Sequence, residues 1–375
     1  MGLRLESFDE EVLLGSITKR FSSNDHFCVF NYTVKTQFEK NWNNITLNSR
    51  GTIFDVSTRE LVARGLPKFF NVGETEENQL HNLDKLSIGG FQAADKLDGS
   101  CGMVFYDCYQ DKLCVATRGS FQSEQAIWAT NFLNTQLSAS IRYGLRKLIG
   151  QYENTPIVEI IYPENKIIVD YGDMCSLSLI QVVNNATGDT IPFGEVVSIA
   201  VDIGMDHVLH CENIYDLSQL KCFMNEISGI EKEGWVVRFE NGHLVKFKTA
   251  KYLEMARTLR HFGPKVVFNL AKSKQTVIQH FIDNELPDAL FEASNKYYNA
   301  ILLKAEEYKR GLYDDFGWVV SSVGNDATRK DYALFMKENN SAWLIGVFFD
   351  WRNGKDISEF IWNKMLDYRD FEWEL

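Results

Sequence analysis

The pattern of apolar residues changes near residue 250, and this change limits the folds open to the chain. From about residue 25 to 250, short segments rich in β-branched and aromatic residues are bounded by Gly, Asn or Asp, which is typical of strands. After Lys251, apolar residues recur at helical spacing. We therefore predict an α+β fold with two domains, a strand-rich domain over 1–250 and a mostly helical domain over 251–375.

Particular segments allow sharper predictions. We expect strands at residues 29–34, 51–56, 102–109, 112–119, 156–162, 166–171, 176–183, 234–240 and 243–248. Asn241-Gly242 lies between the last two and predicts a hairpin. Residues 123–149 have helical spacing, with Ser123 as the candidate N-cap. The segment 342–351 is compatible with a strand or with a buried helix.

Several classes of protein are excluded. No apolar run is long enough to span a bilayer. The first residues, MGLRLESFDEEVLL, contain early acids and no small-residue cleavage site, so we expect no signal peptide. Seven cysteines without a C-x-x-C pair fit a reducing compartment. We expect a cytoplasmic protein, in the host cytoplasm if the source is a virus.

The charge is unevenly distributed. A net charge of −12 taken alone argues against a nucleic-acid partner. Between Lys246 and Lys274, however, eight Lys or Arg residues stand against one acid, Glu254. Such a tract is either a solvated helix face or a surface for an anionic partner.

Common catalytic motifs are missing. The sequence contains no G-x-x-x-x-G-K-[ST] and no G-x-G-x-x-G phosphate loop, and no G-x-S-x-G elbow. His207, His210 and Cys211 lie close together, but no second Cys/His cluster stands at zinc-finger spacing, so ordinary structural roles are the better interpretation.

Lys96, in the stretch ADKLDGSCG, is the candidate nucleophile. The structural alternative is a turn at Leu97-Asp98-Gly99 with Lys96 facing water. A free lysine has a pKa of about 10.4, so nucleophilic attack near neutral pH requires other cations or desolvation to favour the amine.

Further cations and acids stand in strand contexts along the chain. Lys246 and Lys248 alternate in LVKFK and therefore point to one face of a strand. Two lysines on one face suit a phosphate between them, and we expect such cations to lower the pKa of Lys96. The other candidates are Arg50, Lys68, Arg118, Glu159 and Glu233.

The order KLDGS, TRGS, VEIIYPENKIIV, EGWVV, KFK resembles the covalent nucleotidyltransferase superfamily of ATP-dependent ligases and RNA capping enzymes. RGTIF before PKFFN, TRGSFQSEQA after the lysine, YPENKIIVDY and the helical C-terminal third are similar to the T-even phage RNA ligase 1 type. The resemblance covers about Tyr32 to Lys248. It implies a mostly antiparallel-sheet adenylyltransferase domain over 1–250 and an all-helical domain over 251–375 that recognises the RNA substrate.

The resemblance also implies roles for individual residues. Lys96 would attack the α-phosphate of ATP, Glu159 would hold the ribose hydroxyls, and Glu233 would help to position Mg²⁺. The remaining nucleotide-binding positions would be Tyr32, Arg50, Lys68, Arg118, Lys246 and Lys248. Asp98 would support the metal or the loop geometry, and Asp288 could match a metal-binding acid of the helical domain. The family has a lysine where Arg118 stands, and arginine keeps the charge with a different hydrogen-bond geometry.

The implied activity is ATP-dependent sealing of an RNA 5′-phosphate to a 3′-hydroxyl through lysyl–AMP and an adenylylated RNA end. Nicked tRNA is a possible substrate, and an end-healing kinase/phosphatase a possible partner, with no membrane involved. Three alternatives stay open: a DNA ligase, a GTP-dependent capping enzyme, and an RNA-binding module that kept the fold without the chemistry. The first two usually carry a small β-barrel after KFK, which the helical pattern beyond residue 250 disfavours.

Overall fold

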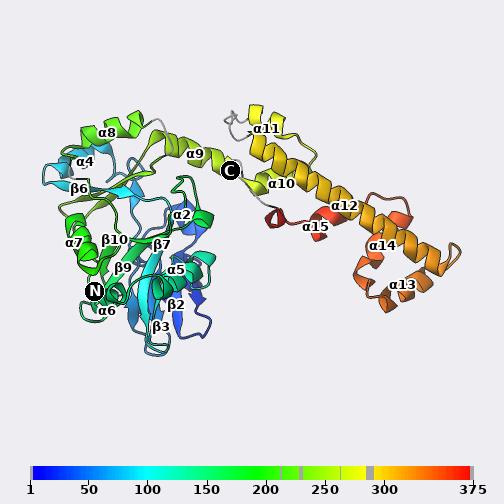
Figure 1. Cartoon of the computed structure of the whole chain (residues 1–375), viewed down its shortest axis with the longest axis horizontal. Coiled ribbons are helices and arrows are strands. Elements are labelled where there is room, and N and C mark those ends of the chain that lie inside the picture. The colour runs from blue at the N-terminus through cyan, green and yellow to red at the C-terminus, as the bar shows by residue number, and fades with distance from the viewer. Residues whose placement is uncertain (1–2, 212, 228–230, 262, 284–290, 372–375) are drawn as a thin grey trace. The chain divides into compact units, whose positions relative to one another are not determined.

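The computed structural model describes residues 3–211, 213–227, 231–261, 263–283 and 291–371. The chain divides into two compact units, Met1–Met255 and Ala256–Leu375 (Figure 1). The first contains every strand that the structure describes, and the second is helical. The predicted α+β class is therefore confirmed. None of the described helices has the length and apolar character needed to cross a membrane.

The first unit is built on three four-stranded sheets. One sheet has the order β1 (Ile17–Phe21), β2 (Phe27–Tyr32), β3 (Thr52–Asp55), β4 (Leu61–Ala63). The second is β10 (Ser176–Asn184), β9 (Asn154–Ile161), β7 (Ser100–Asp107), β8 (Lys112–Thr117), and the third is β5 (Phe70–Asn71), β12 (Leu244–Lys248), β11 (Gly234–Phe239), β6 (Phe91–Lys96). Neighbouring strands are antiparallel except β12 and β5.

The β10–β9–β7–β8 sheet and the β5–β12–β11–β6 sheet pack face to face. Their shared core includes Met103, Ile157 and Val183 from one sheet and Ala94 and Leu244 from the other. The outer face of the β10–β9–β7–β8 sheet is covered by α5 (Glu124–Thr135), α6 (Ala139–Gly150) and α7 (Phe193–Ile203). The outer face of the β5–β12–β11–β6 sheet is covered by α4 (Leu80–Ser87) and α8 (Leu217–Glu226). The first unit also contains α1 (Leu5–Leu13), α2 (Val34–Glu39), α3 (Asn44–Asn48) and η1 (Pro163–Asn165).

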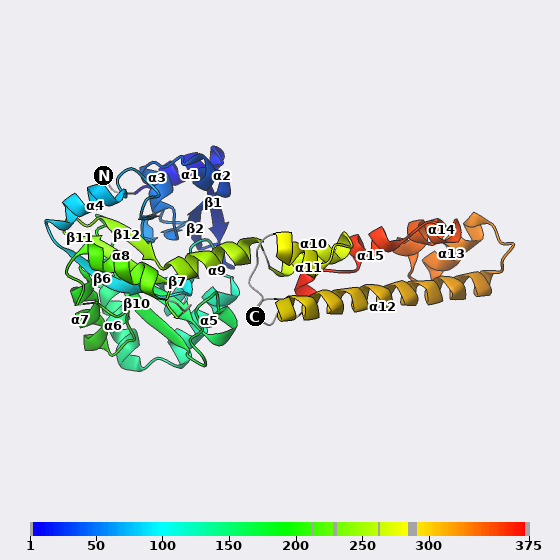
Figure 2. The same cartoon turned by 90° about the horizontal axis from the view of Figure 1, so that it is seen from above.

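The second unit is organised on one long helix, α12 (Phe291–Val323), with the shorter helices along it (Figure 2). Its core combines aliphatic side chains such as Leu312 with the aromatic rings of Phe316, Tyr332 and Phe348, which are buried together. The shorter helices are α10 (Pro264–Lys272), α11 (Val277–Asp283), α13 (Arg329–Glu338), η3 (Ala342–Leu344), α14 (Ile345–Arg352), α15 (Ser358–Lys364) and η4 (Tyr368–Asp370). Helix α9 (Ala250–His261) runs from the first unit into the second.

Most local predictions are confirmed, and one is wrong. Asn241 and Gly242 connect β11 and β12 as a hairpin, with Gly242 at φ +84°. Residues 123–149 form the two helices α5 and α6, and Ser123 accepts a hydrogen bond from the Ala126 N–H as the predicted N-cap. The segment 342–351 is helical. Residues 166–171, predicted as a strand, are irregular, because a side chain rather than a neighbouring strand binds their N–H groups, as described below.

Candidate active site

Lys96 lies at the end of β6, where the strand pairing brings it opposite Gly234 of β11. Its Nζ is 2.7 Å from Oε2 of Glu233, the residue before that glycine. Gly234 has φ +147°, and a Cβ there would come within 2.0 Å of the Phe247 carbonyl oxygen. Only glycine therefore allows β11 to start this close to β12 and to hold Glu233 beside Lys96.

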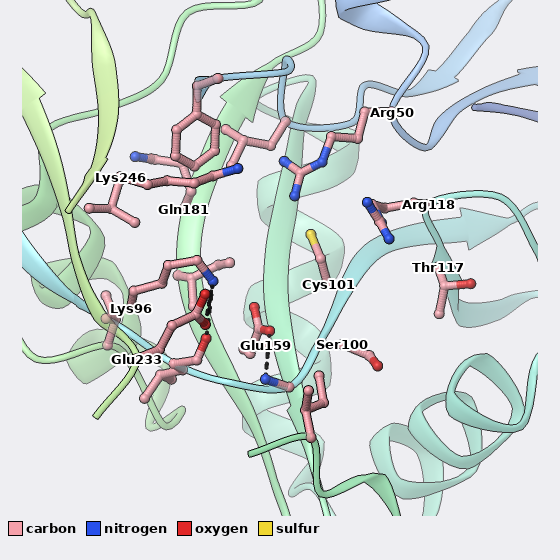
Figure 3. Close-up of a pocket in the computed structure, with 18 of the residues that line it drawn as sticks. Arg50, Lys96, Ser100, Cys101, Thr117, Arg118, Glu159, Gln181, Glu233 and Lys246 are labelled. Atoms are coloured by element: carbon pink, nitrogen blue, oxygen red, sulfur yellow. Dashed lines mark hydrogen bonds and ion pairs between the residues drawn. The ribbon is translucent and has the colours of Figure 1, made fainter. Parts of the chain in front are cut away.

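Glu233 joins two lysines. Its Oε1 lies 2.7 Å from Nζ of Lys248, which the register places opposite Gly234 on the other side of β11. Glu233 is 3 % exposed, while the two lysine side chains are about one-fifth exposed. A nearly buried carboxylate thus holds two ammonium groups at the wall of one cavity. Figure 3 shows its pair with Lys96.

The acids control the protonation of Lys96. Burial by itself would lower the pKa of Lys96, but the carboxylates of Glu233, Glu159 and Asp98 outweigh it and raise the pKa above its ordinary value. The expectation that neighbouring cations lower this pKa is therefore wrong. The strand pairing sets the Glu233 carboxylate at hydrogen-bond distance from Lys96, and the charges that shift this pKa are carboxylates.

Glu159 lies on β9, opposite Cys101 of β7, and is 7 % exposed. Its Oε1 accepts a hydrogen bond from the Gly99 N–H at 3.1 Å. Burial, supported by the charge of Glu233, raises the pKa of Glu159 to about 7, although Lys96 opposes this shift. Gly99 permits the approach, since a Cβ there would meet the Ile160 carbonyl oxygen at 2.5 Å.

These groups share a cavity of about 610 Å³ between the two packed sheets (Figure 3). Its volume lies within the range of small-molecule sites. The structure brings most of the predicted site residues to its wall: Arg50, Lys96, Arg118, Glu159, Glu233, Lys246 and Lys248. The wall carries six Lys or Arg side chains and three carboxylates, although the whole chain has a net charge of −12. The cavity therefore favours an anion.

Four of these six cations, Arg20, Arg50, Arg118 and Lys246, have no anionic partner among the residues that the structure describes. Nη1 of Arg50 is buried without a hydrogen-bond partner, and its guanidinium lies over the Phe69 ring. Nζ of Lys246 lies over the same Phe69 ring, 4.4 Å from its centroid. Arg118 directly follows β8. Burial and the nearby cations Arg50, Lys96 and Lys68 hold the pKa of Lys246 well below its usual range. A bound phosphate would relieve this repulsion.

Tyr32 and Lys68 do not line the cavity. Nζ of Lys68 lies over three rings, 5.5 Å from Tyr32, 5.5 Å from Trp42 and 5.0 Å from Phe70. The structure therefore places these two residues in an aromatic cluster outside the cavity wall, and the charge of Lys68 still lowers the pKa of Lys246.

Asp98 has a structural role, because its carboxylate joins two segments by hydrogen bonds. Its Oδ2 accepts the N–H groups of Ile168 and Val169, both at 2.9 Å, and its Oδ1 accepts the Tyr252 hydroxyl at 2.7 Å. Both carboxylate oxygens are thus used in holding the 168–169 loop and the start of α9. Asp288 lies outside the described residues.

The described donors do not form a metal site by themselves. In the described ranges, no group of three or more His, Cys, Asp or Glu side chains is arranged to hold a metal ion. Both Glu233 oxygens are occupied by lysines. This donor set fits Mg²⁺ only as one carboxylate beside phosphate oxygens that a nucleotide would supply, which is a common arrangement for this ion.

Several residues of the cavity wall were not anticipated from the sequence. They are Thr18 and Arg20 of β1, Asn31 of β2, and Ile180 and Gln181 of β10. No motif or charge pattern marks them, because they reach the cavity only through the packing of sheets. Asn31 Oδ1 and Gln181 Nε2 are buried there without a hydrogen-bond partner.

A strand-borne lysine, buried carboxylates and unpaired cations thus surround one cavity in an α+β fold, which defines a candidate site for an anionic ligand. The chain belongs to the RNA ligase family, whose sequence model matches residues 48–285.

Individual relatives share only part of their sequence with this chain. The chain is 32 % identical over 142 residues to a putative RNA ligase of Thermovibrio ammonificans, and 25 % identical over 163 residues to the uncharacterized protein ORF64 of Ostreid herpesvirus 1. These matches cover 37 % and 42 % of this chain and only 34 % and 38 % of the two relatives. Among solved structures, an archaeal ATP-dependent RNA ligase has a TM-score of 0.47 and 12 % identity, covering 81 % of this chain and 79 % of that one.

Proposed function

We propose that this chain is an ATP-dependent RNA ligase that joins an RNA 5′-phosphate to a 3′-hydroxyl through a lysyl–AMP intermediate on Lys96. The observation that carries the proposal is the position of Lys96 at the wall of a cation-rich cavity, with Glu233 at 2.7 Å. The family match supports the RNA substrate.

In the first step, Nζ of Lys96 attacks the α-phosphorus of ATP. A P–N bond forms, the bond from the α-phosphorus to the bridging oxygen breaks, and pyrophosphate leaves. Lys96 must first lose a proton, and Oε2 of Glu233 is within hydrogen-bond distance to accept it. Covalent catalysis of this kind divides one difficult transfer into easier steps.

The remaining charged groups position and neutralise the phosphates. Lys246 and Lys248 would contact the α-phosphate, while Arg50, Lys68 and Arg118 would hold the outer phosphates or the RNA 5′-phosphate. Glu159 would hold the ribose hydroxyls, since its carboxylate lies on the same wall. Tyr32 would contact the nucleotide from the aromatic cluster. Phosphoryl transfer depends on such positioning and charge neutralisation more than on a strong acid or base.

Mg²⁺, bound with the nucleotide's phosphates beside Glu233, would supply further neutralisation of their charge. In the second step the same lysine is the leaving group. An oxygen of the RNA 5′-phosphate attacks the lysyl–AMP phosphorus and breaks the P–N bond, and Lys96 recovers its proton. The 3′-hydroxyl of the second RNA end then attacks the 5′-phosphate, loses its proton and releases AMP.

We extend the proposal to RNA repair, with nicked tRNA as a candidate substrate and the helical unit as the part that recognises RNA. A ligase that requires a 5′-phosphate and a 3′-hydroxyl depends on an end-healing kinase/phosphatase wherever breaks leave other ends. The basic tract from Lys246 to Lys274, which continues from the site strand β12 into the helices, supports an RNA-binding role.

The test is intact mass spectrometry after incubation with ATP and Mg²⁺. We expect the wild type to gain one adenylate, the Lys96→Ala variant to gain none, and the surface variant Lys221→Ala to behave as wild type, because Lys221 pairs with Asp84 away from the cavity. Labelling by GTP instead of ATP would favour a capping-type enzyme. RNA binding without any nucleotide transfer, on protein not already adenylylated, would leave only a binding module.

A further inference from the structure

Strand β10 contains an irregularity that places two consecutive side chains on one face. Leu179 pairs with Val158 and Gln181 with the next residue of β9, Ile157, so Ile180 is inserted without a partner. Before the bulge, Leu177 and Leu179 face the helix-covered core, and after it Val182 does. Ile180 and Gln181 therefore both point toward the other face, where the cavity lies. Bulges near active sites commonly re-aim a side chain in this way.

The bulge leaves the side-chain NH₂ group of Gln181 without a hydrogen-bond partner in the described structure. The side chain is 2 % exposed, and its Oε1 accepts the Val182 N–H at 2.8 Å. This bond fixes the orientation of the amide, so the other end is the NH₂ group. Nε2 is buried and has no hydrogen-bond partner. Buried donors without a partner are rare in folded proteins, and one at a cavity wall indicates a partner supplied by a ligand.

The residues around Gln181 indicate which kind of ligand group would accept a hydrogen bond from its NH₂ group. Its neighbour Ile180 packs against an apolar group that includes Leu66, Phe193 and Val208, all of which line the cavity. Figure 3 shows Gln181 on the Lys246 side of the cavity and Arg118 on the opposite side. A neutral donor among apolar side chains suits an uncharged ring that offers an acceptor nitrogen, whereas a phosphate is better served by the unpaired cations.

We propose that Gln181 reads the base of the nucleotide, its NH₂ group donating to a ring nitrogen of adenine while Ile180 and its apolar neighbours contact the ring. This proposal rests on the proposed function, because it assigns the base end of the nucleotide whose α-phosphate Lys96 attacks. Gln181 is a specificity-determining residue in this scheme, and it takes no part in the transfer itself.

The experiment compares ATP with 1-deaza-, 3-deaza- and 7-deaza-ATP, each of which replaces one acceptor nitrogen by C–H. The readout is kcat/KM for formation of the lysyl–nucleotide by the full chain. In the wild type we expect one of the three analogues to react at least about 10-fold more slowly than ATP, because a buried donor then loses its partner. This comparison requires no variant and so does not depend on how a mutant folds.

Two variants assign the effect to a residue. In Gln181→Met we expect ATP and the affected analogue to react equally, within about 2-fold, because the donor is gone. Gln125→Met is the matched control, since Gln125 lines the same cavity from α5. We expect it to keep the full difference between ATP and the analogue.

The outcomes separate the two proposals. If the wild type is labelled but reacts equally with ATP and all three analogues, the assignment of Gln181 is wrong and the ligase proposal stands. If Gln181→Met retains the discrimination, another group reads the base and the assignment is again wrong. If no nucleotide adds to Lys96 of the wild type, both proposals fail.

Discussion

Nζ of Lys96 lies 2.7 Å from Oε2 of Glu233, so the proposed nucleophile forms an ion pair with this acid. The pair is created by register, because β6 and β12 flank β11 and bring Lys96 and Lys248 to the two sides of Gly234. The carboxylate raises the pKa of Lys96, so the ammonium must lose its proton before it can attack.

Replacement of Glu233 by Gln tests this pair. Because the carboxylate favours the charged lysine, its loss should lower the pKa of Lys96. The rate of adenylylation should rise with pH in both proteins, and we expect the midpoint to fall by about one pH unit or more in Glu233→Gln. The maximal rate should fall by about 10²-fold, because the proton acceptor is lost. Single-turnover labelling across pH measures both quantities, and an unshifted midpoint would contradict the ion-pair account.

From the raised pKa of Glu159 we expect the stability of the protein to depend on pH. Burial, assisted by the charge of Glu233, raises its pKa from 4.5 to about 7 in the folded protein. Between these values the folded state binds more protons than the unfolded state, so the contribution of Glu159 to stability is present below about pH 4.5 and is lost as pH rises through about 7. Glu159→Gln removes this titration. We expect it to gain stability relative to wild type as pH rises, by up to about 3 kcal/mol.

Thermal or urea unfolding of both proteins from pH 5 to 8 measures this difference. The Glu124→Gln variant is a suitable control, because Glu124 is an exposed residue in the first turn of α5. A difference between Glu159→Gln and wild type that stays constant with pH would show that Glu159 does not titrate in this range.

From the low pKa of Lys246 we expect proton uptake when a nucleotide binds. Its pKa is held well below the usual range by burial and by the cations around it. A phosphate beside it would favour the ammonium and raise that pKa, so binding should draw a proton from solution. Calorimetric titration with ATP in two buffers of different ionisation enthalpy measures the uptake. We expect Lys246→Met to abolish it and to weaken ATP binding by about 10-fold.

A lysine outside the cavity provides the comparison for Lys246. Lys221→Met should bind ATP with the same proton uptake as wild type, because Lys221 pairs with Asp84 and is not part of the cavity wall. Equal heats in the two buffers for the wild type would mean that Lys246 already carries its proton in the empty site.

The sequence predicted those parts of the fold and site that depend on local pattern and motif order. The Asn241-Gly242 hairpin, the Ser123 cap and the helical second unit are local features. The motif order pointed to Lys96 and Glu233 together, because residues at adjacent strand ends meet when the strands pair. The prediction of a strand at KIIVDY was wrong, because Asp98, some 70 residues earlier, accepts hydrogen bonds from two N–H groups of this segment.

Other features depend on distances that no pattern contains. The direction of the Lys96 pKa shift follows from the close contact with Glu233 rather than from the number of nearby cations. The aromatic surroundings of Lys68 depend on how β2 and β5 lie relative to each other, and the orientation of Gln181 depends on a bulge in β10. A single inserted residue in a strand reverses which side chains face the site, and apolar alternation in SLSLIQVV does not reveal it.

The proposed role of the helical unit in binding RNA makes a prediction about charge alone. Lys265 in α10 and Lys274 just after it are exposed. If both contact phosphates, Lys265→Ala and Lys274→Ala should each weaken RNA binding and reduce the slope of log K against log [salt] by about 0.7–0.9. Adenylylation in the absence of RNA should be unchanged, since neither residue lines the cavity.

Lys355→Ala is the matched control in the same unit, because Lys355 pairs with Asp350 and its charge is already compensated. It should leave both the affinity and the salt slope as in wild type. Titration of a fluorescent nicked RNA hairpin at several salt concentrations measures the three variants together. If the Lys265 and Lys274 variants matched the Lys355 control, the basic tract would be a solvated helix face, and the RNA-binding surface would have to be sought elsewhere in the chain.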